Sequence, residues 1–370
     1  MGIAIRPYTE DWVPAVAAFN RRLADGGVPR EFHFPEHHQP AWLPKIDGRR
    51  VFQEFYVATE GDQVRGAYIL KVHEFWVNGR VMPVTYYHLP VSEGIVNRRY
   101  STLGVQMLRG AMKGHPRLFC LGMGGFDRPL PQMLKAMGWS MCAVPFHFHV
   151  ERPARFLRHV AVLRRRPVPR LLADAASISG LGWLGINAVQ RARTAPSVPG
   201  VTAEYVHAFG PWADELWQDC QSQYTLIAAR DSAALNALYP SDKAVLRLRV
   251  HRGTRTIGWA VLLDTQMNGN RYFGDLRVGS IADCLAAPED ALAVVQAATA
   301  VLRARGVDLL VSNQSHAAWT AALDRAGFLR GPSNFIFAAS QALSRTIEPF
   351  DVNRTTVHFN RGDGDGPVNL

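Results

Sequence analysis

The stretch His88-Leu-Pro-Val-Ser-Glu-Gly-Ile-Val-Asn-Arg-Arg-Tyr-Ser-Thr-Leu-Gly104-Val-Gln-Met-Leu108 decides the fold, because it predicts a strand that enters a tight turn and then a helix. The first backbone N–H groups of a helix lack partners within it and carry partial positive charge, so this junction can hold an anion. Arg99 supplies a cation, and Gly104 lets a ligand approach the backbone closely. A Ser/Thr cluster before an apolar run is more often an ordinary helix cap.

Strand and helix patterns surround this junction. Apolar runs separated by glycine turns predict strands at 55–59, 66–73 and 81–89, and the chain begins with a strand that leads into a helix at 12–24. After the junction we expect a helix at 105–113, a strand at 117–122, a glycine loop at 123–126 and a helix at 128–137.

That order resembles the GNAT superfamily of N-acyltransferases, whose Arg/Gln-x-x-Gly-x-Gly/Ala motif binds the pyrophosphate of acyl-coenzyme A between the fourth strand and the third helix. The motif here is Arg99-Tyr-Ser-Thr102-Leu-Gly104, with Thr in place of the first Gly, which narrows the approach to the backbone. The resemblance implies an α+β fold, in which a mixed, mostly antiparallel sheet is flanked by helices. It also implies acyl-CoA binding by Arg99, Tyr100, Ser101, Thr102, Leu103, Gly104 and, at the family's Asn position, Asp127.

The sequence departs from the family at the residue that protonates the departing thiolate. The family tends to end its fourth helix with Asn-x-x-Ala-x-x-x-Tyr-x-x-x-Gly-Phe, and counting back from Gly138-Trp139 places Leu134 at the Tyr position. Leucine cannot donate a proton. Another group or solvent then protonates the thiolate, whose thiol has an ordinary pKa of about 8.5, or this half binds a ligand without transferring anything.

Amine attack on a thioester needs a base and a donor that polarises the carbonyl. Glu93 and His88, just before the turn, are the candidate catalytic bases, acting directly or through a water. The structural alternatives have equal weight: Glu93 orders the turn, and His88 is a half-buried strand residue. Tyr86 and Tyr87 alternate along a strand, as core aromatics do, and Asp127 is also the expected N-cap of the helix at 128–137.

The pattern restarts beyond residue 200. We expect strands at 201–206, 244–252, 256–264, 271–278 and 307–312, and helices at 212–223, 288–305 and 316–326. Where the motif should stand, the segment Ile281–Asp290 ends with two acids, Glu289 and Asp290, which would repel a pyrophosphate. The Tyr position is again leucine, Leu323, and the Asn position is His316. The segment Arg230–Tyr239 also resembles one common in tandem members of the group.

These observations predict tandem GNAT-like domains. We expect an N-terminal domain at 1–151 with the acyl-CoA site, a linker at 152–199, a degenerate C-terminal domain at 200–345 and a tail at 346–370. A chain of 370 residues is long enough for two cores. Its four cysteines have no metal-ligand spacing, and its N-terminus lacks a secretory pattern, which favours a reducing cytoplasm.

The net charge of +10 is concentrated in the linker. Against two acids, Glu151 and Asp174, this region holds Arg152, Arg155, Arg158, Arg164, Arg165, Arg166, Arg170, Arg191 and Arg193. The apolar stretch 171–190 makes a poor transmembrane span, because it is barely long enough and contains Asp174 and several polar residues. It is either a connector packed against both domains or a peripheral contact with an anionic membrane, made by the arginines and by Leu171, Leu172, Leu181, Trp183, Leu184 and Ile186.

Three further clusters lie outside the motif. His33, His37 and His38 with Glu31 and Glu36 resemble a metal set, but we expect a loop over the acceptor pocket and no metal. His147 and His149 alternate on a strand, so they line a pocket between the halves or face solvent. The tail at 360–367 has a calcium-like Asp-x-Asp spacing without the later Glu, which favours a flexible terminus.

The sequence thus predicts a cytoplasmic enzyme that transfers an acyl group from acetyl-CoA or another acyl-CoA to an amine. The resemblance makes an amino sugar or cell-envelope precursor the expected acceptor. Two alternatives stay open. One is a Fem-type transferase that uses aminoacyl-tRNA, for which the basic linker would bind RNA, and the other is a non-catalytic binding module in which both halves have lost the donor.

Overall fold

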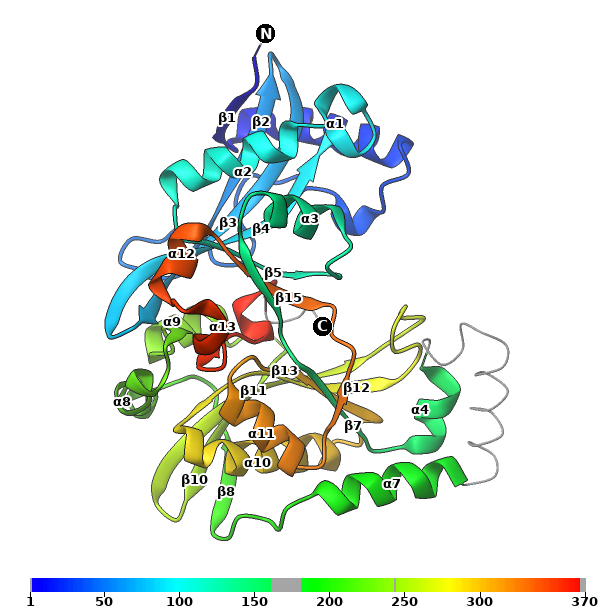
Figure 1. Ribbon diagram of the computed structural model, residues 1–370, viewed down its shortest axis with the longest axis vertical. Coiled ribbons are helices and arrows are strands. Elements are labelled where there is room, and N and C mark those ends of the chain that lie inside the picture. The colour runs from blue at the N-terminus through cyan, green and yellow to red at the C-terminus, as the bar shows by residue number, and fades with distance from the viewer. Residues whose placement is uncertain (1, 161–180, 243, 367–370) are drawn as a thin grey trace. The chain divides into compact units, whose positions relative to one another are not determined.

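The computed structural model describes residues 2–160, 181–242 and 244–366, and the chain divides into two compact units. Unit 1 comprises residues 1–142 and 336–352, and unit 2 comprises residues 143–335 and 353–370. Each unit is built around one mixed sheet with helices against it (Figure 1). Among the described residues, no helix is long and apolar enough to cross a membrane.

The sheet of unit 1 has the strand order β1-β2-β3-β4-β5-β15-β6. Its strands are β1 (Ala4–Pro7), β2 (Phe52–Glu60), β3 (Gln63–Val77), β4 (Arg80–Ser92), β5 (Leu118–Met123), β15 (Phe335–Ala339) and β6 (Ser140–Ala143). Its helices are α1 (Val13–Asp25), α2 (Leu103–Gly114), α3 (Pro129–Ala136) and α12 (Gln341–Thr346), followed by α13 (Phe350–Asn353). Asn78 and Gly79, one of the glycine turns of the sequence, join β3 to β4, and both residues have the positive φ that a tight hairpin turn requires.

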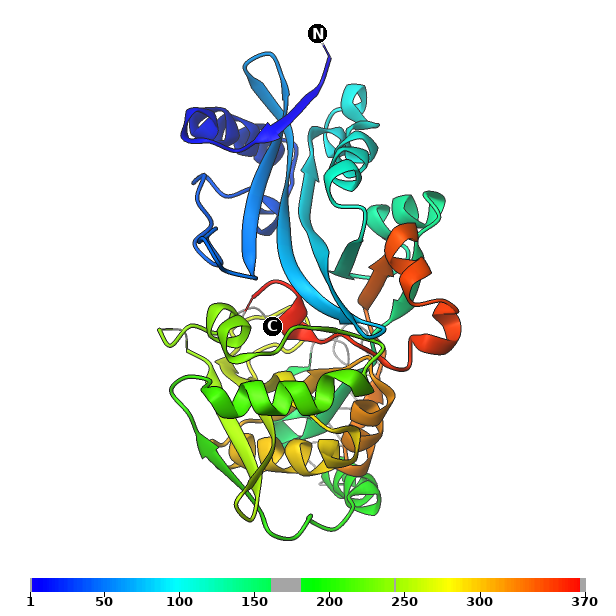
Figure 2. The same ribbon diagram turned by 90° about the vertical axis from the view of Figure 1, so that its left-hand side faces the viewer.

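Helices cover both faces of this sheet, with α1 on one face and α2 on the other (Figure 2). Helix α1 buries Val16, Phe19 and Leu23 against β2 and β3. Helix α2 is amphipathic, and its buried positions Leu103, Met107, Leu108 and Ala111 recur at the spacing that places them on one side of a helix. The two faces of the sheet therefore belong to separate apolar clusters.

The sheet of unit 2 has the strand order β14-β7-β13-β12-β11-β10-β8. Its strands are β7 (Phe146–Val150), β8 (Val201–Tyr205), β10 (Leu246–Arg252), β11 (Arg255–Gln266), β12 (Arg277–Ala286), β13 (Leu309–Asn313) and β14 (Leu329–Gly331). Outside this strand order, β9 (Leu226–Ala228) pairs with β16 (Val357–His358). Its helices are α4 (Pro153–His159), α7 (Leu181–Arg193), α8 (Pro211–Cys220), α9 (Ser232–Leu238), α10 (Ala291–Ala304) and α11 (Ala317–Arg325). Helices α10 and α11 pack together on one face of the sheet (Figure 1).

The two units exchange one strand each. Strand β15 comes from the C-terminal half of the sequence but lies between β5 and β6 in unit 1. Strand β7 comes from the N-terminal half but pairs with β13 and β14 in unit 2. Neither sheet is therefore complete without a segment from the other half of the chain.

One strand prediction in the second half was wrong. The strand expected at 271–278 is β12, which begins at Arg277 and continues to Ala286. Residues 281–286 are consequently strand and not the turn before a helix. The turn starts at Ala287, and the acids Glu289 and Asp290 still lie at the start of α10, in a 3-10 turn at Pro288–Asp290.

Candidate functional site

The candidate site begins at a bulge in strand β4 of unit 1. On β3, Ala67 pairs with Val91 of β4, and Ile69 pairs with His88. Two residues of β4, Leu89 and Pro90, therefore lie opposite the single residue Tyr68. Leu89 has a φ of 43°, which is unusual for a residue with a branched side chain. Bulges of this kind interrupt strand pairing and re-aim neighbouring groups, and they are common beside functional sites.

Strands β4 and β5 pair over only two positions, Thr85 with Leu118 and Tyr86 with Phe119. Past these positions the Tyr86 hydroxyl donates a hydrogen bond to the Leu121 carbonyl at 3.1 Å. Strand β5 then ends in a loop with left-handed backbone, in which Met123 has a φ of 67°. The carboxyl ends of two parallel strands thus border the bulge, which is the edge of a sheet where ligands commonly bind.

The turn from β4 into α2 is held by its own polar groups. Side chains of Ser92 and Asn97 accept hydrogen bonds from the backbone N–H groups of Gly94 and Arg99. A Cβ at Gly94 would overlap the Tyr100 carbonyl oxygen, so only glycine fits there. By contrast, no side chain caps the start of α2 at Thr102.

Gly104, in the first turn of α2, has room around it. A Cβ added there would come no nearer to another residue than 3.7 Å, the distance to Met133 Sδ. The uncapped first turn of α2 can therefore donate backbone N–H groups to an anion.

Glu93 is buried and engaged by two arginines. Its carboxylate lies 3.0 Å from Arg22 Nη2 and 3.0 Å from Arg65 Nη1, and only 3% of the residue is exposed. Arg65 also reaches Glu60, which accepts hydrogen bonds from the Tyr100 hydroxyl at 2.7 Å and from Arg99 at 2.9 Å. The hydrogen bond from Tyr100, with the nearby arginines, lowers the pKa of Glu60. Glu93 thus anchors the turn through ion pairs.

His88 lies at the bulge and is half-buried. Its Nδ1 atom is 3.3 Å from the Tyr86 hydroxyl, and the two rings are 5.1 Å apart. Because Tyr86 borders the end of the β4–β5 pairing, His88 is close to the place where the two strands stop pairing. Of the two candidate bases, His88 is therefore the one at the strand opening.

The expected acyl-CoA residues divide by burial. Tyr100 and Leu103 pack in the core, whereas Arg99, Ser101 and Thr102 are exposed. Asp127 is exposed and is not the helix cap that we expected, because α3 begins at Pro129 after Arg128 at the N-cap. Leu134 is fully buried in the same core as Leu103, so apolar packing accounts for it.

In unit 2, strand β12 has a matching bulge, because Val261 faces Asp283 and Leu262 faces Ile281, which leaves Ala282 extra. Beside this bulge lies a buried network that we call the Arg230 network. It consists of Arg230, Tyr239, Asp283, Asn360 and Asp363.

The Arg230 network joins the C-terminal segment to the sheet. Arg230 lies 3.0 Å from Asp283 and 2.5 Å from Asp363, and all three side chains have no exposed surface. The flexible terminus expected at 360–367 was wrong, because its described residues 360–366 contain a 3-10 turn at Arg361–Asp363 and are mostly buried. At the start of α10, Asp290 pairs with Arg252 at 2.7 Å. No pattern in the sequence identified Asp283 and Asp363 as partners of Arg230, since they are 53 and 133 residues away.

Four of the histidines in the other predicted clusters, His33, His37, His147 and His149, have structural contacts. His33 and His37 lie within hydrogen-bonding distance of backbone carbonyls, and Glu36 accepts a hydrogen bond from Asn20. His147 and His149 are buried in β7, so neither faces solvent. Burial lowers the pKa of His147 to about 4 despite the nearby Asp324.

Part of the basic linker is already paired. Arg152 and Arg155 both contact the buried carboxylate of Asp308 at 3.2 Å. Leu184 of α7 is exposed, whereas Ile186 packs against an apolar cluster of unit 2. The predicted membrane-contact residues Arg164, Arg165, Arg166, Arg170, Leu171 and Leu172 lie outside the described residues.

No protein-family model matches the sequence, and no curated protein sequence matches it. Solved structures do match. N-myristoyltransferase from Saccharomyces cerevisiae with bound myristoyl-CoA and inhibitors has a TM-score of 0.51 and 11% identity, over 91% of this chain and 79% of that one. A probable N-acyltransferase from Enterococcus faecalis has a TM-score of 0.50 and 9% identity, over 94% of this chain and 74% of that one.

A GCN5-related N-acetyltransferase from Anabaena variabilis has a TM-score of 0.51 and 9% identity, over 91% of this chain and 72% of that one. At such low identity these likenesses concern the fold. They confirm the expected architecture of mixed sheets flanked by helices. The chain therefore has the α+β fold of GNAT-type N-acyltransferases.

Proposed function

We propose that the chain is an N-acyltransferase that takes an acyl group, acetyl in the simplest case, from a coenzyme A thioester held by unit 1 and transfers it to an amine. The observation that carries this proposal is the difference between the two helix starts. Neither helix has a side-chain cap, but α2 begins with an open Gly104 and no acid in its first turn, whereas α10 begins at Asp290, which is paired to Arg252. Only the first suits a pyrophosphate.

Backbone groups are the main donors to the pyrophosphate in this proposal. Arg99 is 70% exposed but is held by Glu60 at 2.9 Å, so its guanidinium has to leave that carboxylate before it reaches the ligand. An exposed ion pair of this kind stabilises the chain little, and the rearrangement is therefore small in energy. We expect Arg99 to contribute less to donor affinity than the first turn of α2, which includes Gly104.

The thioester would then extend toward the bulge and the ends of β4 and β5. The acceptor nitrogen attacks the thioester carbon, the C–S bond breaks, coenzyme A leaves as thiolate, and His88 takes the proton from the nitrogen. Solvent protonates the thiolate, because Leu134 has no proton to give. Glu93, buried between Arg22 and Arg65, is a positioning residue for the turn in this scheme.

We propose that the acceptor is an amino sugar or a related envelope precursor and that the reaction takes place in the cytoplasm. The chain would consist of two GNAT-like halves, of which unit 1 binds the acyl donor. Peripheral contact with an anionic membrane belongs to the same proposal. It is supported by exposed Leu184 and Val189 on α7, together with Arg191 and Arg193 at its end.

Calorimetry with acetyl-CoA tests donor binding. We expect micromolar affinity, a loss of more than tenfold in Gly104→Trp, and a smaller loss in Arg99→Ala. Arg98→Ala is the matched control, because Arg98 is an exposed neighbour in the same 3-10 turn. Absence of binding to acetyl-CoA and to longer acyl-CoA thioesters would refute the proposal.

The base is tested by His88→Gln under conditions where donor binding is unchanged. Loss of a general base lowers kcat by about 10²–10⁴-fold and removes the corresponding limb of the pH profile. If Glu93→Gln lowered kcat by this factor at unchanged thermal stability while His88→Gln did not, the roles of the two residues would be reversed. Salt-sensitive binding of aminoacyl-tRNA without acyl-CoA binding would favour the Fem-type transferase, and binding of neither would favour the non-catalytic module.

A further inference from the structure

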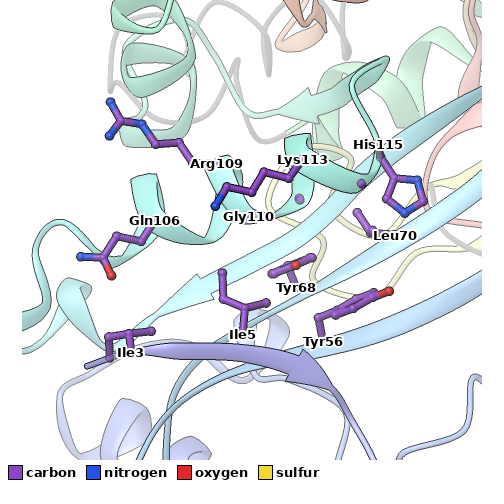
Figure 3. A pocket seen from close by; sticks show the side chains of 12 residues that line it. Ile3, Ile5, Tyr56, Tyr68, Leu70, Gln106, Arg109, Gly110, Lys113 and His115 are labelled. Atoms are coloured by element: carbon purple, nitrogen blue, oxygen red, sulfur yellow. The ribbon is translucent and has the colours of Figure 1, made fainter. Parts of the chain in front are cut away.

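A cavity of about 640 Å³ lies in unit 1 on the sheet face that α2 covers (Figure 3). Its apolar side is formed by the beginning of the chain and by strands β2 and β3, through Ile3, Ile5, Leu70 and the rings of Tyr56 and Tyr68. The two tyrosine rings are stacked, with centroids 5.3 Å apart. The volume is within the range of about 300–1,000 Å³ that is typical of small-molecule sites.

The helix side of this cavity runs from Gln106 to Gly114 and on to His115. Gln106, at one end of this lining, donates a hydrogen bond to Thr102 Oγ1 of the donor turn at 3.2 Å, but the two glycines of α2 point to different places. Gly104 faces Met133 of α3, whereas Gly110 faces Ile5 of β1, where an added Cβ would overlap the Ile5 side chain. The two glycines are six residues apart and hence about 120° apart around the helix. Gly104 of the donor turn and Gly110 of the cavity are therefore on different sides of α2.

The rim of the cavity is basic. Arg109 and Lys113 are exposed, and neither forms an ion pair with any residue that the structure describes. In Figure 3 the Lys113 side chain runs along α2, and the Arg109 side chain points away from Ile3, Ile5 and the tyrosine rings. Cations that are free of protein partners leave their hydrogen-bonding capacity for a ligand.

Two titratable groups at the lining, Glu54 beside Tyr56 and His115, do not cancel this charge. Glu54 is occupied by Lys45 at 2.9 Å and by the Tyr56 hydroxyl at 3.2 Å. His115 is half-buried with its Nδ1 3.1 Å from the Thr85 hydroxyl, and burial lowers the pKa of His115, which disfavours its charged form. The cavity thus combines an apolar floor with two free positive charges at its edge.

We propose that this cavity binds an amphiphilic anion, an alkyl carboxylate whose chain lies on Ile5, Leu70 and the tyrosine rings and whose head group lies between Arg109 and Lys113. Burial of the chain supplies the affinity, and the two cations select the sign of the head group. The proposal is independent of the acyltransferase activity, because it uses the side of α2 that carries Gly110 and not the side that carries Gly104.

Calorimetry on the full chain tests the proposal with decanoate, with decyltrimethylammonium as the cationic counterpart and with decanol as the neutral one. We expect micromolar binding of decanoate and at least tenfold weaker binding of the other two. The double variant Arg109→Glu/Lys113→Glu should weaken decanoate at least tenfold. Arg21→Glu, an exposed arginine on α1, is the matched charge control and should leave decanoate binding unchanged.

Gly114→Phe tests the location. A Cβ there meets nothing within 4 Å, so the ring can occupy the cavity without displacing the helix, and decanoate binding should disappear while the far-ultraviolet circular dichroism is retained. Gly104→Trp, at the donor turn, should leave decanoate binding intact. The proposal is overturned if decanoate fails to bind at 1 mM, if the ammonium binds equally well, or if Gly104→Trp rather than Gly114→Phe abolishes binding.

Discussion

Replacement of Arg230 by methionine tests the buried charges of unit 2. Methionine retains an unbranched stem but removes the guanidinium, which leaves Asp283 and Asp363 buried with no exposed surface and no counter-charge. Removal of one partner from a buried ion pair costs about 3–5 kcal/mol, since the remaining charge stays desolvated. Folding stability is typically only about 5–15 kcal/mol, so Arg230→Met should lose a large fraction of it.

Urea unfolding followed by tryptophan fluorescence measures this loss. Arg158→Met removes an exposed arginine and is the matched control, for which we expect a change within about 0.5 kcal/mol. The triple variant Arg230→Met/Asp283→Asn/Asp363→Asn removes the stranded charges as well. It should therefore recover at least half of the loss.

The C-terminal segment provides a second readout. Asp363 joins residues 357–366 to Arg230, so limited proteolysis should cut this segment faster in Arg230→Met than in the parent chain. The reasoning is refuted if Arg230→Met loses less than about 1 kcal/mol, or if the triple variant is no more stable than Arg230→Met alone.

Four other expectations follow from described contacts. Gly362→Ala places a Cβ in overlap with the Tyr239 hydroxyl, so it should lower Tm in a thermal melt and expose the C-terminal segment to protease; an unchanged Tm would contradict this. Burial lowers the pKa of His316 to about 4, so below pH 6.5 the unfolded chain binds more protons than the folded one. Folding stability should therefore fall by about 2 kcal/mol between pH 7 and 5. In His316→Asn, which can still cap α11, the urea midpoint should depend less steeply on pH. Gln190→Leu leaves the N–H and C=O of Val150 without the side-chain partners they have at 2.8 and 3.0 Å, and should destabilise the chain by about 2 kcal/mol in urea unfolding. Residues 1–151 expressed alone lack β15, so circular dichroism should show no cooperative melt, and a sharp transition would argue against the need for the exchanged strand.

Local patterns were sufficient for the elements of the first half. The spacing of Leu103, Met107, Leu108 and Ala111 predicts the α2 helix, because apolar burial on one side of a helix repeats with its turn. Asn78-Gly79 predicts the β3–β4 hairpin for a similarly local reason, the positive φ of both residues. The start of β12 was harder to predict, because the aromatic residues Tyr272 and Phe273 favour a strand. The chain there forms a turn instead, in which the backbone N–H groups of both residues donate to the Asn270 side chain.

The site was only partly predictable. The position of the turn between β4 and α2 follows from the sequence, and so does the contrast with the acidic start of α10. The role of Glu93 does not follow, because its partners Arg22 and Arg65 lie 71 and 28 residues away. The sequence also did not predict the bulge at Leu89, because a bulge is defined by how the residues of β4 pair with those of β3.

By itself, the sequence determined the order of the helices and strands around the turn from β4 into α2, the absence of acids from the start of α2 and the absence of an ionisable side chain at Leu134, because each depends on neighbouring residues and side-chain chemistry. Tertiary structure alone decided the exchange of β7 and β15, the burial of the C-terminal segment on Arg230, and the basic cavity beside α2. These features depend on contacts between residues far apart in the chain, whose pairing is selected by the packing of the whole unit and not by any local pattern.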